Sequence, residues 1–153
     1  MSPLDNVRIL EFPGVADPAR GILTVAERLH FDRILPSGGT ESYTFPIRRV
    51  FYIHGIPEGG RRGGHAHTSN CEILICINGS FDLTLSDSRR ETTYHLSDPT
   101  RGIVIPPDAW TRMENFAPQT ILLVLCSEEY SEEGYIHDFK AYRRYITEKY
   151  STS

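Results

Sequence analysis

Short runs of apolar residues, separated by turn residues, recur along most of the chain. They are mostly about four to eight residues long, are rich in β-branched and aromatic side chains, and several alternate polar and apolar positions. This pattern is typical of an all-β sandwich or barrel. The predicted strands are residues 7–12, 22–27, 47–54, 72–77, 81–85, 92–96, 102–105, 111–115 and 120–126, and residues 31–43 are expected to be irregular. Asn78-Gly79 and residues 86–88 are predicted to be hairpin turns.

The C-terminal part of the chain has a different period. Ile136, Phe139, Tyr142 and Ile146 recur at intervals of three or four residues. This spacing predicts an amphipathic helix over about residues 136–150, packed on the outside of the sheet or on a partner. Together with the strands before it, the helix is expected to complete a single domain over residues 1–153.

Composition and charge narrow the class of protein. Apolar residues make up 39% and charged residues 24%, which excludes a disordered, collagen-like or coiled-coil chain. The net charge of −4 argues against nucleic acid or an anionic membrane as the main partner. The first residues lack the features of a signal peptide, and no apolar run approaches a membrane span. The odd number of cysteines, all in apolar runs, favours buried free thiols and a cytoplasmic location.

One segment concentrates residues that can carry chemistry. Gly59 is followed at fixed intervals by His65, His67, Glu72 and Gly79. Side chains two apart on a strand share a face, so the two imidazoles point the same way, and a returning strand can bring the Glu72 carboxylate to the same place. Two chemistries fit such a group. It could bind a divalent metal with open positions, or it could perform metal-free acid–base catalysis.

The spacing resembles the first conserved motif of the cupins. A second cupin-like segment follows, in which Pro106, Asp108, Thr111 and Asn115 occupy the four marked positions. Thr111 stands where that motif has a histidine, and this weakens the metal interpretation because threonine is a poor substitute for imidazole.

A wider resemblance links these motifs. Arg20-Gly21, FPIRRVFYI (45–53), RGGHAH (62–67), NGSFDLTL (78–85), IPPDAW (105–110) and LLVLCSEEYSEEGYI (122–136) follow one another in an order that resembles the cupin-type sugar-nucleotide 3,4-ketoisomerases. These enzymes act on dTDP-4-keto-6-deoxyglucose in deoxysugar and aminosugar biosynthesis. The resemblance implies a right-handed double-stranded β-helix, a homodimer, a dTDP-linked keto-deoxyhexose as the substrate, and neither a metal nor another cofactor.

Four positions depart from the family pattern. Glu72 replaces the usual Gln and so completes a possible ligand set of His65, His67 and Glu72. Phe51 replaces an active-site Tyr, Gly134 replaces an Asp, and Thr111 replaces a His that often follows the Trp.

The predicted site combines the motif and the resemblance. The resemblance favours His65 as the catalytic base, with His67 binding or relaying. Six further residues are predicted to contact the substrate: Arg49, Phe51, Arg62, Glu72, Trp110 and Tyr135.

Each of these assignments has an alternative. Glu72 could ligate a metal, fix the tautomer of a histidine or face solvent. Arg49 could bind pyrophosphate or pair with an acid such as Glu72, and Arg62 could be a solvated loop charge. Trp110 and Tyr135 could form an aromatic wall for the sugar or base, or could pack in the core or a dimer interface.

The function predicted from the sequence is the isomerisation of a nucleotide-linked 4-keto-6-deoxyhexose to its 3-keto form through an enediol. A metal-dependent cupin enzyme and a non-catalytic cupin that binds sugar nucleotides are the alternatives. Phe51 keeps the binding-protein alternative open, because the family hydroxyl is missing there.

Overall fold

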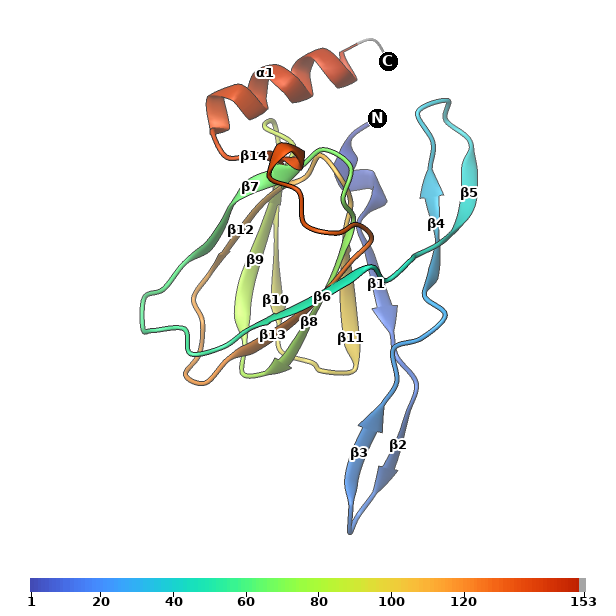
Figure 1. The fold of residues 1–153 in the computed structure, drawn as a ribbon, viewed down its shortest axis with the longest axis vertical. Coiled ribbons are helices and arrows are strands. Elements are labelled where there is room, and N and C mark those ends of the chain that lie inside the picture. The colour runs from blue at the N-terminus through green and yellow to red at the C-terminus, as the bar shows by residue number, and fades with distance from the viewer. Residues whose placement is uncertain (152–153) are drawn as a thin grey trace.

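Strands make up most of the protein, and one helix follows them (Figure 1). The computed structural model describes residues 1–151. Two five-stranded antiparallel sheets contain the predicted strands except that of residues 22–27, which lies in a separate hairpin. The first has the order β1 (Arg8–Glu11), β11 (Arg101–Ile105), β8 (Glu72–Asn78), β13 (Ile121–Cys126) and β6 (Arg49–Ile53). The second has the order β10 (Glu91–Leu96), β9 (Phe81–Ser86), β12 (Trp110–Glu114), β7 (Arg62–His67) and β14 (Tyr135–Ile136).

The main hydrophobic core lies between these two sheets. Leu74 on β8 and Leu122 on β13 meet Leu83 and Leu85 of β9, and all four side chains are buried. Alternation along each strand turns every second residue into this interior, as the polar–apolar pattern predicts. The same alternation places polar side chains in the interior at one end, where the candidate site lies.

A second apolar cluster covers the outer face of the first sheet. Ile73, Ile75 and Leu125 point outward there and are buried by residues such as Phe31 and Phe45. Phe31 belongs to a hairpin of β4 (His30–Ile34) and β5 (Thr40–Thr44). The expectation that residues 31–43 are irregular was therefore wrong. The glycines and proline between the two strands form the hairpin turn, in which the amide of Leu35 donates to the carbonyl of Gly39 at 2.7 Å.

A second hairpin extends away from the body of the molecule (Figure 1). It consists of β2 (Gly14–Asp17) and β3 (Gly21–Thr24), and β3 ends three residues before the predicted end of that strand. Val15, Ile22 and Leu23 on this hairpin are 65%, 71% and 63% exposed. A two-stranded hairpin with exposed apolar side chains is marginally stable by itself in water.

Of the two predicted hairpin turns, one was correct. Residues 86–88 lie in the turn between the paired strands β9 and β10. Asn78-Gly79 instead carries the chain from β8 in one sheet to β9 in the other. Gly79 adopts a φ of 80°, and a Cβ there would lie 2.4 Å from the hydroxyl of Thr120, so the close approach of Thr120 requires glycine.

The helix α1 (Phe139–Tyr150) lies across one end of the molecule (Figure 1). It begins three residues after the predicted start because Tyr135–Ile136 forms β14 and Asp138 caps the helix, its carboxylate accepting the amide of Ala141 at 2.9 Å. Tyr142 and Ile146 are buried against Ala66 and Trp110, in agreement with the predicted apolar face. A short 3-10 helix, η1 (Pro3–Asn6), precedes β1.

The buried side chain of Asp108 connects α1 to the turn before β12. The carboxylate of Asp108 accepts hydrogen bonds from Tyr145 at 2.7 Å and Tyr150 at 2.8 Å, and lies 2.9 Å from the ammonium of Lys149. The amide of Asp108 donates to the carbonyl of His67 at 2.7 Å. The helix is thereby connected to the end of the strand that carries both motif histidines.

Among residues 1–151, no helix is long and apolar enough to cross a membrane. The three cysteines, Cys71, Cys76 and Cys126, are free and buried, as the sequence predicts.

Candidate active site

Strands from both sheets bring the motif residues together. His65 and His67 lie on β7 and face the interior, while Ala66 between them faces outward beneath α1. Glu72 is the first residue of β8 in the opposite sheet, so the loop between β7 and β8 carries the motif across the interior. One ligand atom from each of His65, His67 and Glu72 falls within a group no wider than 4.8 Å. The predicted convergence of two imidazoles and a carboxylate is present.

His67 and Glu72 form a buried pair. Nε2 of His67 lies 3.5 Å from Oε1 of Glu72, and the two residues are 6% and 7% exposed. That separation is an ion-pair distance, but Nε2 has no aligned hydrogen-bond partner. The other carboxylate oxygen of Glu72 lies 3.7 Å from the sulfur of Cys126. Burial, and next the carboxylate of Glu72, raises the pKa of Cys126 to about 12, so its protonated thiol can donate to that oxygen.

His65 is held in its neutral form. Burial is the main cause that lowers its pKa from the ordinary 6.5, and the neighbouring His67 lowers the pKa further. Glu72 acts in the opposite direction but does not outweigh them. A neutral imidazole in the interior can accept a proton, which is the property a general base requires.

Tyr135 covers the two histidines from β14. It pairs with His67 across the strands, and its ring centroid lies 4.3 Å from that of His67 and 5.1 Å from that of His65. The carbonyl of Gly134 accepts the amide of Thr68 at 2.9 Å, which fixes the loop after β7. Of the two alternatives for Tyr135, its position beside the imidazoles fits a wall of the site.

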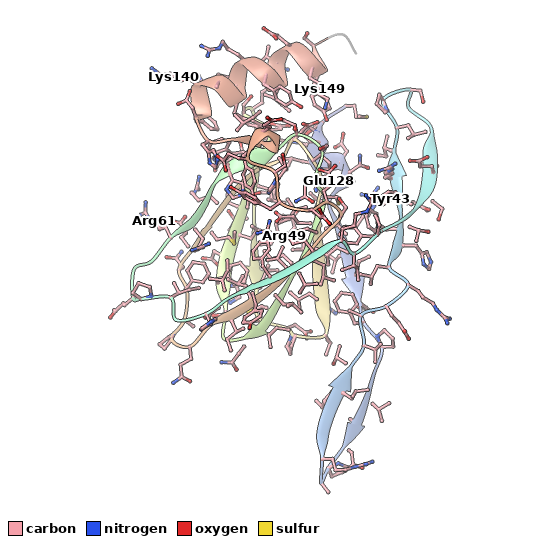
Figure 2. The ribbon with its side chains drawn as sticks, viewed as in Figure 1. Tyr43, Arg49, Arg61, Glu128, Lys140 and Lys149 are labelled. Carbon is pink, nitrogen blue, oxygen red and sulfur yellow. The ribbon has the colours of Figure 1, made fainter. Side chains whose placement is uncertain are left out.

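Arg49 and Phe51 face the same interior from β6. The guanidinium of Arg49 lies 4.7 Å from the ring centroid of Phe51 and 5.2 Å from that of Tyr130. No ion pair joins Arg49 to Glu72 in the described part of the chain. Figure 2 shows Arg49 in the middle of the molecule, below Glu128. A small cavity of about 10 Å³ is bounded in part by Arg49, His67, Tyr130 and Tyr135.

A bulge in β7 determines the direction of Arg62. Arg62 pairs with Met113 and His65 pairs with Thr111, so β7 has one residue more than β12 between these two pairs. Because residues paired across antiparallel strands share a face, Arg62 and His65 both face inward although they are three apart. Arg62 is exposed, and its place at the mouth of the site stays a prediction.

Thr111 and Trp110 point to opposite sides of β12. Thr111 is 2% exposed and lies across from His65, so the fourth position of the cupin motif is beside the site but offers a hydroxyl. Trp110 packs on the outer side against Phe139 and Tyr142, with centroids 5.1 Å and 5.2 Å away. The structure therefore separates Trp110 from the other candidates and places it in the packing role that the sequence left open.

Three residues near the site were not identified from the sequence. The ring of His137 is parallel to that of Tyr135, with centroids 5.2 Å apart, and its centroid lies 6.1 Å from that of His65. Glu132 contacts His137, and the hydroxyl of Tyr130 donates to Glu132. The available signal was alternation, because His137 follows Tyr135 by two residues and shares its face if the strand continues.

Comparison with known proteins agrees with this geometry. The family model described as "FdtA: WxcM-like, C-terminal" matches residues 5–147. A TDP-4-oxo-6-deoxy-alpha-D-glucose-3,4-oxoisomerase from Aneurinibacillus thermoaerophilus is 30% identical over an alignment of 125 residues, and the match covers 77% of this chain and 90% of that protein.

Solved structures give the same assignment. QdtA, a sugar 3,4-ketoisomerase from Thermoanaerobacterium thermosaccharolyticum in complex with TDP, has a TM-score of 0.82 and 33% identity, covering 96% of this chain and 98% of that one. WlaRA, a TDP-fucose-3,4-ketoisomerase from Campylobacter jejuni, has a TM-score of 0.77 and 29% identity, covering 92% and 96% of the two chains. The chain belongs to the FdtA-type, WxcM-like family of sugar-nucleotide 3,4-ketoisomerases.

Proposed function

We propose that this protein moves the keto group of a TDP-linked 4-keto-6-deoxyhexose from C4 to C3. The observation that carries the proposal is the pair of inward imidazoles, His65 and His67, with Glu72 beside them in the interior of a ketoisomerase fold. A variant of QdtA with one histidine replaced by asparagine was solved with TDP-4-keto-6-deoxyglucose, at 32% identity to this chain. That ligand is therefore the first substrate to test.

The reaction needs two proton transfers at carbon. In the proposed mechanism, neutral His65 removes the proton from C3, and the C3–H electrons form the C3=C4 double bond of an enediol. The same imidazole then returns its proton to C4 while the C3 oxygen becomes the carbonyl. One group serves both carbons if they present the same face to it. The lowered pKa of His65 supports this assignment because the base must start unprotonated.

His67 and Glu72 act as a positioning pair. The Glu72 carboxylate lies against Nε2 of His67, and a buried imidazole is commonly oriented through one of its nitrogens. Arg49 and Arg62, which both face inward, provide positive charge for the pyrophosphate, and Tyr135 provides an aromatic wall. Phe51 lies beside Arg49 and supplies apolar surface without a hydroxyl.

Product analysis tests the function directly. Purified protein is incubated with TDP-4-keto-6-deoxyglucose, and the sugar is followed by NMR. We expect a 3-keto product that does not form without protein. An unchanged substrate together with tight binding of the TDP-sugar would contradict the isomerase and favour the non-catalytic binding protein, with Phe51 marking the lost chemistry.

A metal-dependent enzyme is the second candidate. The observation that favours it is the closeness of the three donor atoms, together with the unpartnered Nε2 of His67. Against it, the fourth position is the hydroxyl of Thr111. We expect purified protein to hold far less than one equivalent of divalent metal, and chelation to leave turnover unchanged. Stoichiometric metal whose removal abolishes turnover would reverse the order of the two candidates.

The proposal also covers the architecture and the domain organisation of the protein. We propose that the two packed sheets form a cupin double-stranded β-helix and that residues 1–153 constitute one domain. The core shared by the two sheets supports this, as does the 16% identical monoepimerase ChmJ, which matches the fold with a TM-score of 0.66. The free buried cysteines support a cytoplasmic location.

The proposed assembly is a homodimer. The β2–β3 hairpin exposes three large apolar side chains, and β6 is an edge strand that exposes Val50 and Tyr52 by 53% and 66%. Exposed apolar edges of this kind are normally covered in native proteins. The occupant we propose is the β2–β3 hairpin of a second copy, because that hairpin presents both unpaired edges and apolar side chains.

A further inference from the structure

A third histidine lies beside the proposed base. In the β14–β7 ladder, Tyr135 pairs with His67 and Ile136 pairs with Ala66. The next position of this antiparallel register sets His137 opposite His65, and residues opposite one another share a face. The side chains agree with the backbone, because the two imidazole centroids are 6.1 Å apart. Two independent features therefore place His137 at the entrance to the site.

The surroundings of His137 are suited to proton transfer. Its Nε2 lies 3.1 Å from Oε1 of Glu132, whose other carboxylate oxygen accepts the hydroxyl of Tyr130. These contacts, first that of Tyr130 and then that of His137, lower the pKa of Glu132 and keep it ionised. The parallel ring of Tyr135 supports the imidazole from one side. The contact with Glu132 occupies Nε2 of His137 and leaves Nδ1 available to a ligand.

The isomerisation also requires proton transfers at oxygen, which the carbon base does not provide. The C4 carbonyl oxygen must gain a proton as the enediol forms, and the C3 hydroxyl must lose its proton as the new carbonyl forms. We propose that His137, held by Glu132, is a second catalytic residue that exchanges protons with the C3 and C4 oxygens while His65 acts at the carbons. This assignment rests on the proposed function.

The proton balance closes over one cycle. Protonated His137 donates the hydrogen on Nδ1 to the C4 oxygen as His65 takes the C3 proton, which gives a neutral enediol. The C3 hydroxyl then returns a proton to Nδ1 as His65 delivers its proton to C4. Both imidazoles end in their starting states, and no oxidant, reductant or co-reactant is needed. Phe51 cannot share this task because its side chain has no exchangeable proton.

Three variants separate proton transfer from other roles. His137→Gln removes the proton, His137→Phe keeps an aromatic ring on Tyr135 without a proton, and Glu132→Gln removes the stabilising charge. The matched control is His95→Gln, because His95 is also exposed and pairs with an acid, its Nδ1 lying 2.8 Å from Asp82, on the opposite edge strand of the same sheet.

Turnover of TDP-4-keto-6-deoxyglucose is measured for each variant, with kcat and KM determined separately. We expect both His137 variants to lose about 10²- to 10⁴-fold in kcat with KM nearly unchanged, Glu132→Gln to lose less, and His95→Gln to match the unmutated protein. A His137→Phe variant with full kcat, or a loss confined to KM, would overturn the assignment while leaving the proposed function intact. Absence of turnover in the unmutated protein would overturn both.

Discussion

The two motif histidines share one strand face but have different surroundings. His67 is almost fully buried against Glu72, whereas His65 is half-buried. The lowered pKa belongs to His65, with burial as the main cause. These differences support the proposal that His65 acts on the substrate and that His67 with Glu72 positions the site.

Replacement of His65 tests this difference in role between His65 and His67. Asparagine keeps a polar side chain of similar shape but cannot act as a base near neutral pH. We expect His65→Asn to reduce kcat by about 10²- to 10⁴-fold while TDP binding stays nearly intact, because the lost interaction belongs to the transition state. His67→Asn should have a milder effect. Turnover kinetics and calorimetric titration with TDP measure the two properties, and near-normal turnover of His65→Asn would remove it from the mechanism.

The pH dependence of turnover reports the same residue. His65 must be neutral to accept a proton, and its folded-state pKa lies below the ordinary 6.5. The acid limb of kcat/KM is therefore expected below about pH 6.5.

The same shift couples His65 to stability. The unfolded chain binds this proton more readily than the folded protein, so the free energy of unfolding should decrease as the pH falls through about 6.5 toward the folded pKa. Urea titrations at several pH values check this, with His65→Asn as the control that should show a flatter dependence. For turnover, an acid limb of kcat/KM that lies above pH 7 would show that a group other than His65 limits the rate.

Strand β7 illustrates how one element shapes the site. Its bulge contains Gly63 and Gly64, both with positive φ values of 89° and 77°. A Cβ on Gly63 would lie 2.6 Å from the carbonyl oxygen of Thr111, whereas a Cβ on Gly64 would meet nothing within 4 Å. The bulge thus allows Arg62 to face inward, and Gly63 is its sterically restricted position.

The two glycines give a matched pair of substitutions. We expect Gly64→Ala to lower the free energy of unfolding by about 1–2 kcal/mol, from its left-handed backbone alone. Gly63→Ala should lower it by about 3 kcal/mol or more, because the backbone of β12 must also shift. Gly134→Ala is the control, since a Cβ there meets nothing within 4 Å. Urea unfolding measures all three, and equal effects at Gly63 and Gly134 would contradict this account.

Assembly belongs to the scale of the whole molecule. The β2–β3 hairpin extends away from the rest of its own chain in Figure 1, and it carries Val15, Ile22 and Leu23 exposed on its surface. Such a segment gains stability only when another surface covers its apolar side chains. The second copy proposed above would provide that surface along β6.

Sedimentation tests the dimer and its location. We expect the unmutated protein to sediment as a dimer at micromolar concentration, with more than about 1,000 Å² buried in total. The double change Ile22→Asp and Leu23→Asp should yield monomers, because charges cannot be buried there without partners. Glu148→Lys, at an exposed position of α1, is the control and should remain dimeric. A monomeric unmutated protein would refute the dimer, and a dimeric double variant would place its interface elsewhere.

The local pattern of residues was enough to predict many of the strands, the buried face of the helix and the convergence of the motif residues. Alternation and turn residues predicted most strands of the two large sheets but missed β2, β4, β5 and β14. The three-to-four spacing of Phe139, Tyr142 and Ile146 predicted the buried face of α1. The intervals around His65, His67 and Glu72 predicted their convergence, because strand geometry fixes which side chains share a face. Local pattern failed at residues 31–43, where the two strands and the turn of the β4–β5 hairpin were interpreted as irregular structure.

Other features depend on contacts between segments far apart in the chain. The bulge that turns Arg62 inward is defined by the register of β7 with β12. Trp110 points outward, and it is buried there because α1 covers that face of the sheet. His137 enters the site because β14 pairs with β7 across about seventy residues of sequence, a pairing that no local period encodes. The sequence alone determined the strand faces and the motif residues. The tertiary structure decided which faces meet, because pairing between distant strands depends on the packing of the whole core.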